Sequence, residues 1–289
     1  MTRDQSKAAG KRRSLAYHLK RTVLPHVFLS LVGLIFLFPF VWLFLNSLKT
    51  PQEIFSLPPK LWPEELQWSN YARAFQSMPF FGYVLNTLFL VIANIVGHLF
   101  SAPLVAYSLA KIRWRGRGAV FALVLATVIL PPQVTMIPMY IIFAKLGWVN
   151  TYLPLIIPSF LGSSFNIFLL RQFLLGIPNE LSDAARIDGA SEFRIYWQIM
   201  LPLLMPPLAA IAIFTFQGVW HDFFGPLIYL NDERLWTISV GLQGFLQQHG
   251  AQWELLMAAA TLFTLPSVIA YFIGQKYFIQ AGTQLVQYK

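Results

Sequence analysis

Few side chains in this sequence have both the chemistry and the setting for acid–base work. His221 and Asp222 are adjacent and follow a long apolar stretch, so they form the one sequence-local ionisable pair near a membrane. His98 lies four residues after Asn94 in another apolar stretch, which puts both side chains on one helix face. We expect that face to point inward. No acid lies in the same or a neighbouring stretch, so an interhelical hydrogen bond is the favoured role of His98.

No catalytic motif accompanies these residues. The sequence has no G-x-x-x-x-G-K-[ST] phosphate-binding loop, so any process driven by ATP would need its nucleotide site on another subunit. H-E-x-x-H and G-x-S-x-G motifs are missing too, and the sequence contains no cysteine, which removes thiol catalysis and cysteine-ligated metals. The chain is therefore expected to be non-catalytic, with no cofactor and no metal.

The composition predicts an all-α membrane protein. Hydrophobic residues make up 56% of the 289 residues and charged residues only 11%, about half the charged share of an ordinary soluble domain. The net charge of +9 would suggest a nucleic-acid partner in a soluble protein. Here the basic residues cluster beside apolar stretches, as in the cytoplasmic loops of membrane proteins, so nucleic-acid binding is disfavoured.

Six stretches are apolar enough to cross a membrane as helices. A spanning helix needs about 20 residues, because each residue rises about 1.5 Å through a hydrocarbon core about 30 Å thick. Four stretches are nearly uninterrupted, whereas the fourth and fifth in chain order are broken by proline, glycine or polar residues. The six are residues 27–48, 81–109, 119–143, 153–170, 199–220 and 255–278.

The basic residues predict how these spans are oriented. Six spans put 16 of the 21 Lys and Arg residues on the side of the two termini and five on the other side. Cytoplasmic segments hold the excess of Lys and Arg, so both termini are predicted to be cytoplasmic. The first stretch is too long for a cleaved signal segment and is predicted to stay as a span. The predicted divisions are a basic tail 1–26, a first span 27–48, an extracytoplasmic loop 49–80, a five-span core 81–278 and a cytoplasmic tail 279–289.

Proline residues inside the stretches predict breaks that face protein or a wet cavity, because lipid cannot satisfy the freed carbonyl groups. Pro131 and Pro132 interrupt the third stretch near its middle, and Gln133 follows, so a kink toward the interior is expected. The small residues 162–164 are interpreted as a helix-packing surface. The candidates for lining a pathway are polar residues in or beside the spans: Asn86, Asn94, Gln133, Gln217, His221 and Asp222.

A short helix is predicted in the segment 177–202, between the fourth and fifth spans. Pro178 suits a first helical position, and Gly189 suits the left-handed residue just past a helix end. A helix of about ten residues is marginal alone in water, so it should dock on something. Ser191 is the predicted N-cap of a second helix. Small and apolar residues at i, i+3 and i+4 form the predicted docking face: Leu181, Ala184 and Ala185.

The spacing in this segment resembles the cytoplasmic signature of the permease subunits of binding-protein-dependent ABC importers, which reads E-A-A, three residues, G, nine residues, I-x-L-P. The same spacing occurs here in Asp183-Ala184-Ala185, Gly189 and Ile199-Met200-Leu201-Pro202. Asp183 replaces the family's Glu, which keeps the charge but shortens the reach. Further likeness to the smaller, six-span permease of the carbohydrate-uptake (maltose-type) group is carried by Ser47-Leu48-Lys49, Asn70-Tyr71 and Leu85-Asn86-Thr87.

The resemblance implies a type I ABC importer permease, a multi-pass protein of a bacterial-type inner membrane that forms half of the pathway for a sugar or sugar-like solute. The implied partners are a homologous second permease subunit, a dimer of ATP-binding subunits that hydrolyse ATP, an extracytoplasmic solute-binding protein and membrane lipid. The residues implied to couple to the ATPase are Glu180, Asp183, Ala184, Ala185, Gly189, Ile199, Leu201 and Pro202.

Two other functions are alternatives to this one. A secondary transporter driven by an ion gradient would need paired acids or lysines deep in the spans, and the sequence has none. A membrane-embedded enzyme would need titratable groups that converge at one depth, and only His221 and Asp222 come close. Sugars, oligosaccharides, polyols and glycerol phosphates all stay open as solutes.

Overall fold

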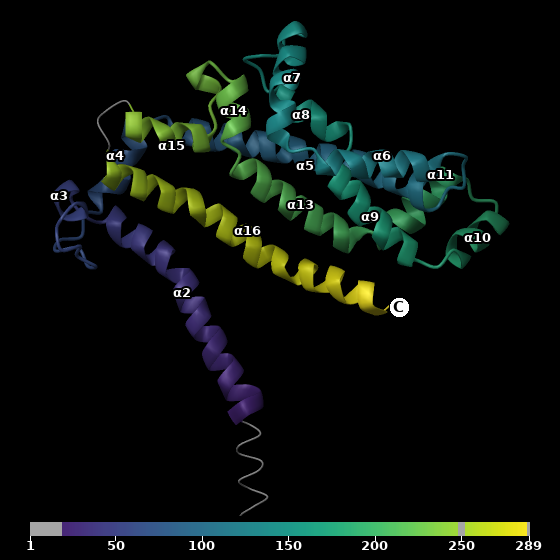
Figure 1. Ribbon diagram of the computed structural model, residues 1–289, viewed down its shortest axis with the longest axis horizontal. Coiled ribbons are helices and arrows are strands. Elements are labelled where there is room, and N and C mark those ends of the chain that lie inside the picture. The colour runs from purple at the N-terminus through teal and green to yellow at the C-terminus, as the bar shows by residue number, and fades with distance from the viewer. Residues whose placement is uncertain (1–18, 248–251, 288–289) are drawn as a thin grey trace, which may run out of the picture. The chain divides into compact units, whose positions relative to one another are not determined.

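The computed structural model describes residues 19–247 and 252–287, and every regular element in these ranges is a helix (Figure 1). The all-α prediction is therefore confirmed. Most of the basic tail 1–26, up to residue 18, and the last two residues lie outside the described residues. In chain order the elements are η1 (Leu19–Val23), α2 (Leu24–Ser47), α3 (Pro51–Ile54), α4 (Ser69–Ser77), α5 (Phe80–Ala110), α6 (Arg117–Ile129), α7 (Pro132–Lys145), α8 (Leu153–Phe160), α9 (Ser164–Gly176), α10 (Glu180–Ile187), α11 (Glu192–Ile195), η2 (Tyr196–Met200), α12 (Leu201–Leu203), α13 (Met205–Trp220), α14 (Phe224–Tyr229), η3 (Glu233–Leu235), α15 (Ile238–Gln247) and α16 (Trp253–Gln287).

Four helical segments in the described residues are long and apolar enough to span a membrane, and the number rises to six if each of two bent pairs counts as one span. The four are 21–47, 80–110, 153–176 and 253–275. Each of the six predicted stretches coincides with one of these segments or with a bent pair. Helix α16 continues to Gln287, so most of the predicted tail 279–289 is helical.

Prolines account for both bent pairs. Helices α6 and α7 meet at Pro131 and Pro132 with a bend of 101°, which confirms the predicted break. The turns up to Leu203 and helix α13 meet at a bend of 72°, next to Pro206 and Pro207. Proline lacks the N–H that would continue the helical ladder, and its ring clashes with the preceding turn. The chain therefore changes direction at each of these two pairs of prolines.

The break expected in the fourth span lies between α8 and α9. Gly162 joins α8 to α9 with φ of +93°, a left-handed conformation that glycine adopts without steric cost. At Gly162 the chain therefore uses the backbone freedom of glycine, and the interpretation of residues 162–164 as a packing surface stays a prediction there. Ser164 does bridge helices, because its Oγ lies 2.5 Å from Oγ1 of Thr127 in α6.

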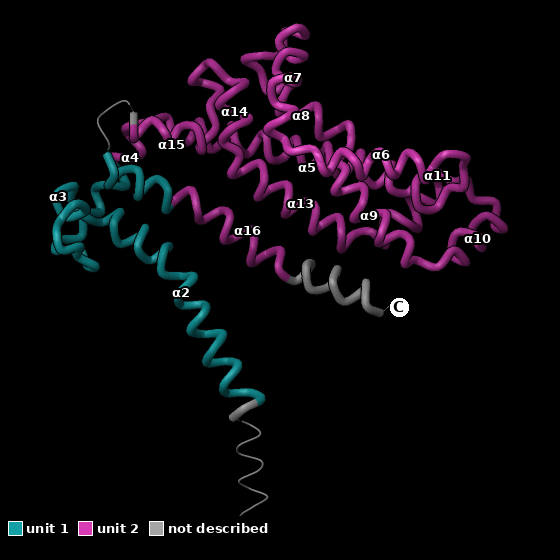
Figure 2. Tube along the Cα trace, viewed as in Figure 1, with its two compact units in different colours: residues 1–72, 252–261 teal, residues 73–251, 262–289 magenta. Residues whose placement is uncertain are grey.

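The first of two compact units comprises residues 1–72 and 252–261 (Figure 2). Its helix α2 exposes apolar side chains along most of its length, and its buried residues lie only in the last turn. An apolar helix with so little protein around it suits a lipid setting or the surface of another subunit.

The chain beyond α2 is fixed by the motif residues that carry the family resemblance. Asn70 Nδ2 donates hydrogen bonds to the carbonyl oxygens of Ser47 and Lys49, at 3.0 and 2.9 Å. The Tyr71 hydroxyl and Ser47 Oγ lie 2.7 Å apart. These two motifs therefore close the loop that follows the first span.

The second unit comprises residues 73–251 and 262–289, and α5 is its central helix. Helices α8, α9 and α13 all pack along α5. The seam between α5 and α8 joins small and polar residues: Asn94 Nδ2 donates to the carbonyl oxygen of Leu155 at 3.0 Å, and Ser101 Oγ donates to that of Ser159 at 2.9 Å. Small residues and interhelical hydrogen bonds are the usual means of helix association in membranes.

Gly97 lies within this seam, and replacing it with valine is expected to destabilise the protein. A Cβ at this position would lie 2.1 Å from Oγ of Ser159 and 2.9 Å from the ring of Phe160. Overpacking of this kind costs about 1–3 kcal/mol. Gly82→Val is the matched control, because a Cβ at Gly82 in the same helix has its nearest neighbour at 3.9 Å. Thermal unfolding of both variants in detergent measures the difference, and equal midpoints would contradict the seam.

Candidate coupling and pathway sites

The segment with the signature spacing forms helix α10, Glu180–Ile187. Gly189 follows it with φ of +80°, which confirms the predicted left-handed residue at the helix end. Ser191 accepts a hydrogen bond from the backbone N–H of Arg194 at 3.3 Å and caps the next helix, as predicted. Pro178 is not the first helical residue, because the helix begins two residues later at Glu180.

The predicted docking face of α10 is split between two sides of the helix. Ala185 and Ser182 point into the protein and are 9% and 2% exposed. Ala184, Leu181 and Ile187 point outward, with Leu181 46% and Ile187 86% exposed. The prediction that Ala184 and Ala185 share one face is therefore wrong. The outward residues are spaced i, i+3 and i+6, so they form one apolar surface on the helix.

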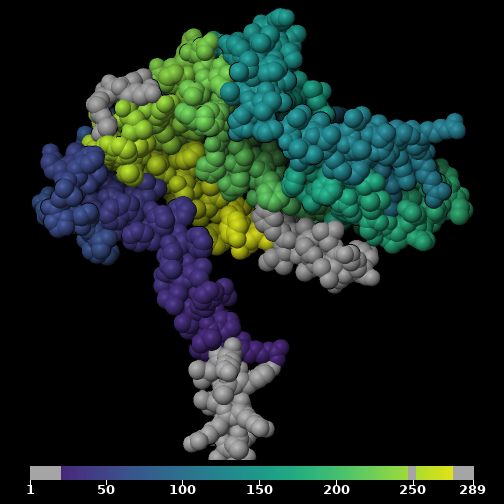
Figure 3. Space-filling model, in the orientation of Figure 1, coloured from purple at the N-terminus to yellow at the C-terminus, as the bar shows by residue number. Residues whose placement is uncertain are grey.

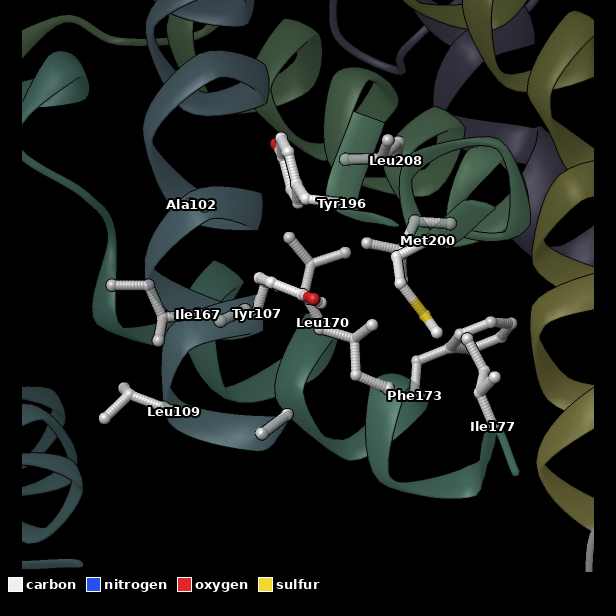
Figure 4. Close-up of a cluster of buried hydrophobic side chains, with 14 of the residues drawn as sticks. Ala102, Tyr107, Leu109, Ile167, Leu170, Phe173, Ile177, Tyr196, Met200 and Leu208 are labelled. Carbon is white, nitrogen blue, oxygen red and sulfur yellow. The ribbon is translucent and has the colours of Figure 1, made fainter. Parts of the chain in front are cut away.

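Ala185 belongs to the hydrophobic core of the second unit. It joins buried side chains from α5, α9 and the turns before α13, among them Tyr107, Leu170 and Met200 (Figure 4). Ile199 and Leu201 of the signature are half-buried and pack against the same cluster, whereas Pro202 is exposed. These signature residues therefore connect α10 to the bent fifth span.

Charged groups hold α10 against its neighbours. Arg186 donates to Asp183 Oδ1 at 2.6 Å and to Glu192 Oε1 at 2.7 Å, and the Tyr107 hydroxyl donates to Glu192 Oε2 at 2.8 Å. The hydrogen bond to Glu192, more than that to Asp183, raises the pKa of Arg186. Asp183, which stands where the family has Glu, is therefore engaged within its own chain. Glu180 stays exposed one turn earlier.

Lys111, at the end of α5, fixes the start of α10. Its Nζ donates to the carbonyl oxygen of Ile177 at 2.6 Å and to Oδ1 of Asn179 at 2.9 Å. Burial lowers the pKa of Lys111, and the nearby Glu180 and Asp183 act in the opposite direction. This contact joins the loop after the second span to the loop after the fourth.

A separate hollow of about 520 Å³ brings together two of the six predicted pathway residues, Gln133 and Asp222. It lies between α7, α8 and α14, and the teal surface of α7 and the green surface of α14 meet there in Figure 3. The rest of the wall comprises mostly apolar and aromatic side chains and glycine: Pro132, Thr135, Met136, Met139, Phe143, Pro154, Pro158, Phe224, Gly225, Ile228 and Tyr229.

The other four predicted pathway residues connect helices instead of lining this hollow. Asn86 Nδ2 donates to the carbonyl oxygens of residues 234 and 236, both at 2.9 Å, and Asn94 binds within the seam described above. Gln217 Nε2 donates to the carbonyl oxygen of Ser267 at 3.0 Å, and His221 Nε2 lies 2.8 Å from Ser267 Oγ. The prediction of an interhelical hydrogen bond at His98 is not met at Nδ1, which is buried without a partner in the described residues.

The aromatic wall of the hollow was not predicted. Tyr229 and Phe143 come from segments that the sequence offers only as a loop and as the end of a span, and their rings meet edge to face at 5.5 Å. One local signal was available. Asp222 precedes Gly225 and Pro226, and its Oδ1 accepts the Gly225 N–H at 3.1 Å, which turns the chain into α14.

Comparisons with known proteins agree with this geometry. The family model described as "Binding-protein-dependent transport system inner membrane component" matches residues 102–281. The arabinooligosaccharides transport system permease protein AraQ of Bacillus subtilis (strain 168) is 33% identical over 260 residues, covering 89% of this chain and 92% of that protein. The sn-glycerol-3-phosphate transport system permease protein UgpE of Yersinia pestis is 31% identical over 263 residues, covering 88% and 93%.

Two solved structures share the fold. A chain of a bacterial ABC transporter involved in the import of the acidic polysaccharide alginate superimposes with a TM-score of 0.77, 26% identity, and coverage of 90% of this chain and 97% of that one. A second chain, from an alginate transporter in complex with an alginate pentasaccharide-bound periplasmic protein, has a TM-score of 0.65 at 18% identity and supports the fold alone.

Fold and matches together define a helical, multi-pass, inner-membrane permease component. The chain belongs to the family of binding-protein-dependent transport system inner membrane components. The resemblance drawn from the spaced signature is therefore confirmed.

Proposed function

We propose that this chain is the permease subunit of an ATP-driven importer, forms half of the translocation pathway for a sugar or sugar-like solute, and couples to a separate ATPase subunit through α10. The observation that carries the proposal is the outward apolar surface of α10, formed by Leu181, Ala184 and Ile187 within the signature segment. An exposed apolar surface on a helix with polar surroundings is typical of a protein interface.

The hollow at α7 and α14 supports a solute pathway. Its aromatic side chains offer flat apolar surfaces, and Gln133 and Asp222 supply a few polar groups, the usual make-up of a small-molecule site. The names of the relatives include oligosaccharide, glycerol phosphate and alginate transport, which makes a sugar or sugar-like solute the best-supported class. A homologous second permease subunit would supply the opposite wall.

The partner set follows from the same reasoning. We expect a second permease, a dimer of ATP-binding subunits and an extracytoplasmic solute-binding protein. Affinity purification of this chain from its own host, followed by mass spectrometry, tests the assembly.

In proteoliposomes, uptake should require ATP inside and the binding protein outside. Uptake driven by an ion gradient without ATP would instead favour a secondary transporter.

The proposed topology, with both termini cytoplasmic, makes a separate prediction. The sequence has no cysteine, so a cysteine introduced at one position is unique. Glu64→Cys, in the loop after the first span, should react with a membrane-impermeant maleimide in intact cells. Arg115→Cys, between α5 and α6, should react only after permeabilisation. Both side chains are exposed, so access decides the result, and the reverse labelling pattern would refute the topology.

A further inference from the structure

A second hollow, of about 550 Å³, lies between α10 and the loop that joins α5 to α6. Neither the family match nor the proposed solute pathway gives it a role. Its wall is rich in charged and polar side chains: Lys111, Arg113, Arg117, Asn179, Ser182, Asp183, Arg186 and Glu192, together with Ala110, Ile112 and Leu175. We call this hollow the basic pocket.

The cations of the basic pocket outnumber the acids that pair with them. Asp183 and Glu192 both bind Arg186. Lys111 donates to two neutral oxygens, with Asp183 and Glu180 near it. Arg113 and Arg117 form no ion pair in the part of the chain that the structure describes. The pocket therefore keeps an excess of positive charge on one side, where the α5–α6 loop forms the wall.

Ser182 belongs to the same wall but does not offer its hydroxyl to the pocket. The residue is 2% exposed, and its Oγ is buried, with no hydrogen-bond partner in the described residues. A buried hydroxyl without a partner is unfavourable, so such groups normally have an acceptor. The feature of the pocket that attracts an anion is therefore its excess of cations.

We infer that the basic pocket binds a phosphate group. Guanidinium groups match phosphate oxygens in a bidentate geometry, and a lysine ammonium adds a point charge. Two sources share this chemistry. One is the headgroup of an anionic phospholipid, which basic pockets at the cytoplasmic ends of spanning helices bind, and the other is a soluble phosphate ester or inorganic phosphate.

The test measures lipid binding to the full-length protein in a neutral detergent by native mass spectrometry. Phosphatidylglycerol is expected to bind in preference to phosphatidylcholine. The double variant Arg113→Gln/Arg117→Gln should weaken phosphatidylglycerol binding by about tenfold or more, because charge-assisted hydrogen bonds are lost. Arg115→Gln is the matched control, since Arg115 lies in the same loop but does not line the pocket.

Ser182→Ala is a second control, because it changes the wall of the pocket without changing its charge. It removes a buried hydroxyl that has no partner, so thermal stability without ligand should be unchanged or higher, and phosphatidylglycerol binding should stay within about twofold of the parent. Displacement of the lipid by millimolar inorganic phosphate would assign the pocket to soluble phosphate. Equal binding of the two lipids with no effect of phosphate, or equal losses in the Arg115→Gln and double variants, would overturn the inference.

Discussion

Ile187→Asp is expected to lower uptake and solute-stimulated ATP hydrolysis of the assembled importer at least tenfold and to release the ATPase subunit during purification. Ile187 is 86% exposed at the end of α10 and contributes little to packing within its own chain. In the proposed interface, however, an aspartate there would bury an unpaired carboxylate, at a cost of at least a few kcal/mol. A loss of about 1.4 kcal/mol already changes an equilibrium tenfold.

Ala185→Asp is the informative comparison, because this alanine lies on the inward side of the same helix. It would put the carboxylate into the hydrophobic core beside Tyr107 and Leu170, so the isolated chain itself should lose thermal stability. Ile187→Asp should leave that stability near the parent value, and Ile187→Leu should preserve both coupling and stability. If Ile187→Asp retains the ATPase subunit and full uptake, α10 is an ordinary connector and the proposed coupling surface is wrong.

Ile187 and Ala185 also show which features of α10 can be predicted from the sequence and which cannot. Gly189 and Ser191 were predicted correctly, because a left-handed helix end and an N-cap depend on neighbouring residues in the chain. The direction in which Ala185 points depends on packing in a core that includes residues of α9 and of α5, and α5 is distant in sequence. A helix this short has too few residues for its pattern to fix its orientation against the protein.

The same limit applies to the polar residues of the spans. An asparagine or glutamine in an apolar stretch must satisfy its amide inside the protein, and this much follows from its type. Whether it lines a pathway or binds another helix depends on which carbonyl lies opposite. Gln217 meets Ser267 and is used in packing, whereas Gln133 follows the break after Pro131 and faces the hollow. The break was predictable from proline, but the aromatic wall across from it was not.

Thr135→Trp is the second prediction with a large expected effect. Thr135 lines the hollow of about 520 Å³ together with Gln133 and Asp222, and an indole there would occupy much of the space proposed for the solute. Uptake should fall at least tenfold, which corresponds to about 1.4 kcal/mol on the barrier to passage. The coupling surface on α10 is untouched by this change. The ATPase subunit should therefore stay bound, in contrast to its loss with Ile187→Asp.

Ile137→Trp controls for bulk on the same helix. Ile137 is 66% exposed and does not line the hollow, so the larger ring meets lipid or the protein surface and uptake should stay within about twofold of the parent. Radiolabelled solute uptake in proteoliposomes, with thermal unfolding of each purified variant, separates blockage from misfolding. A loss of uptake in Thr135→Trp is attributed to a blocked pathway only if this variant folds as well as Ile137→Trp while transporting far less. Parental uptake in Thr135→Trp would remove the hollow from the pathway, because a solute cannot pass through space that an indole fills.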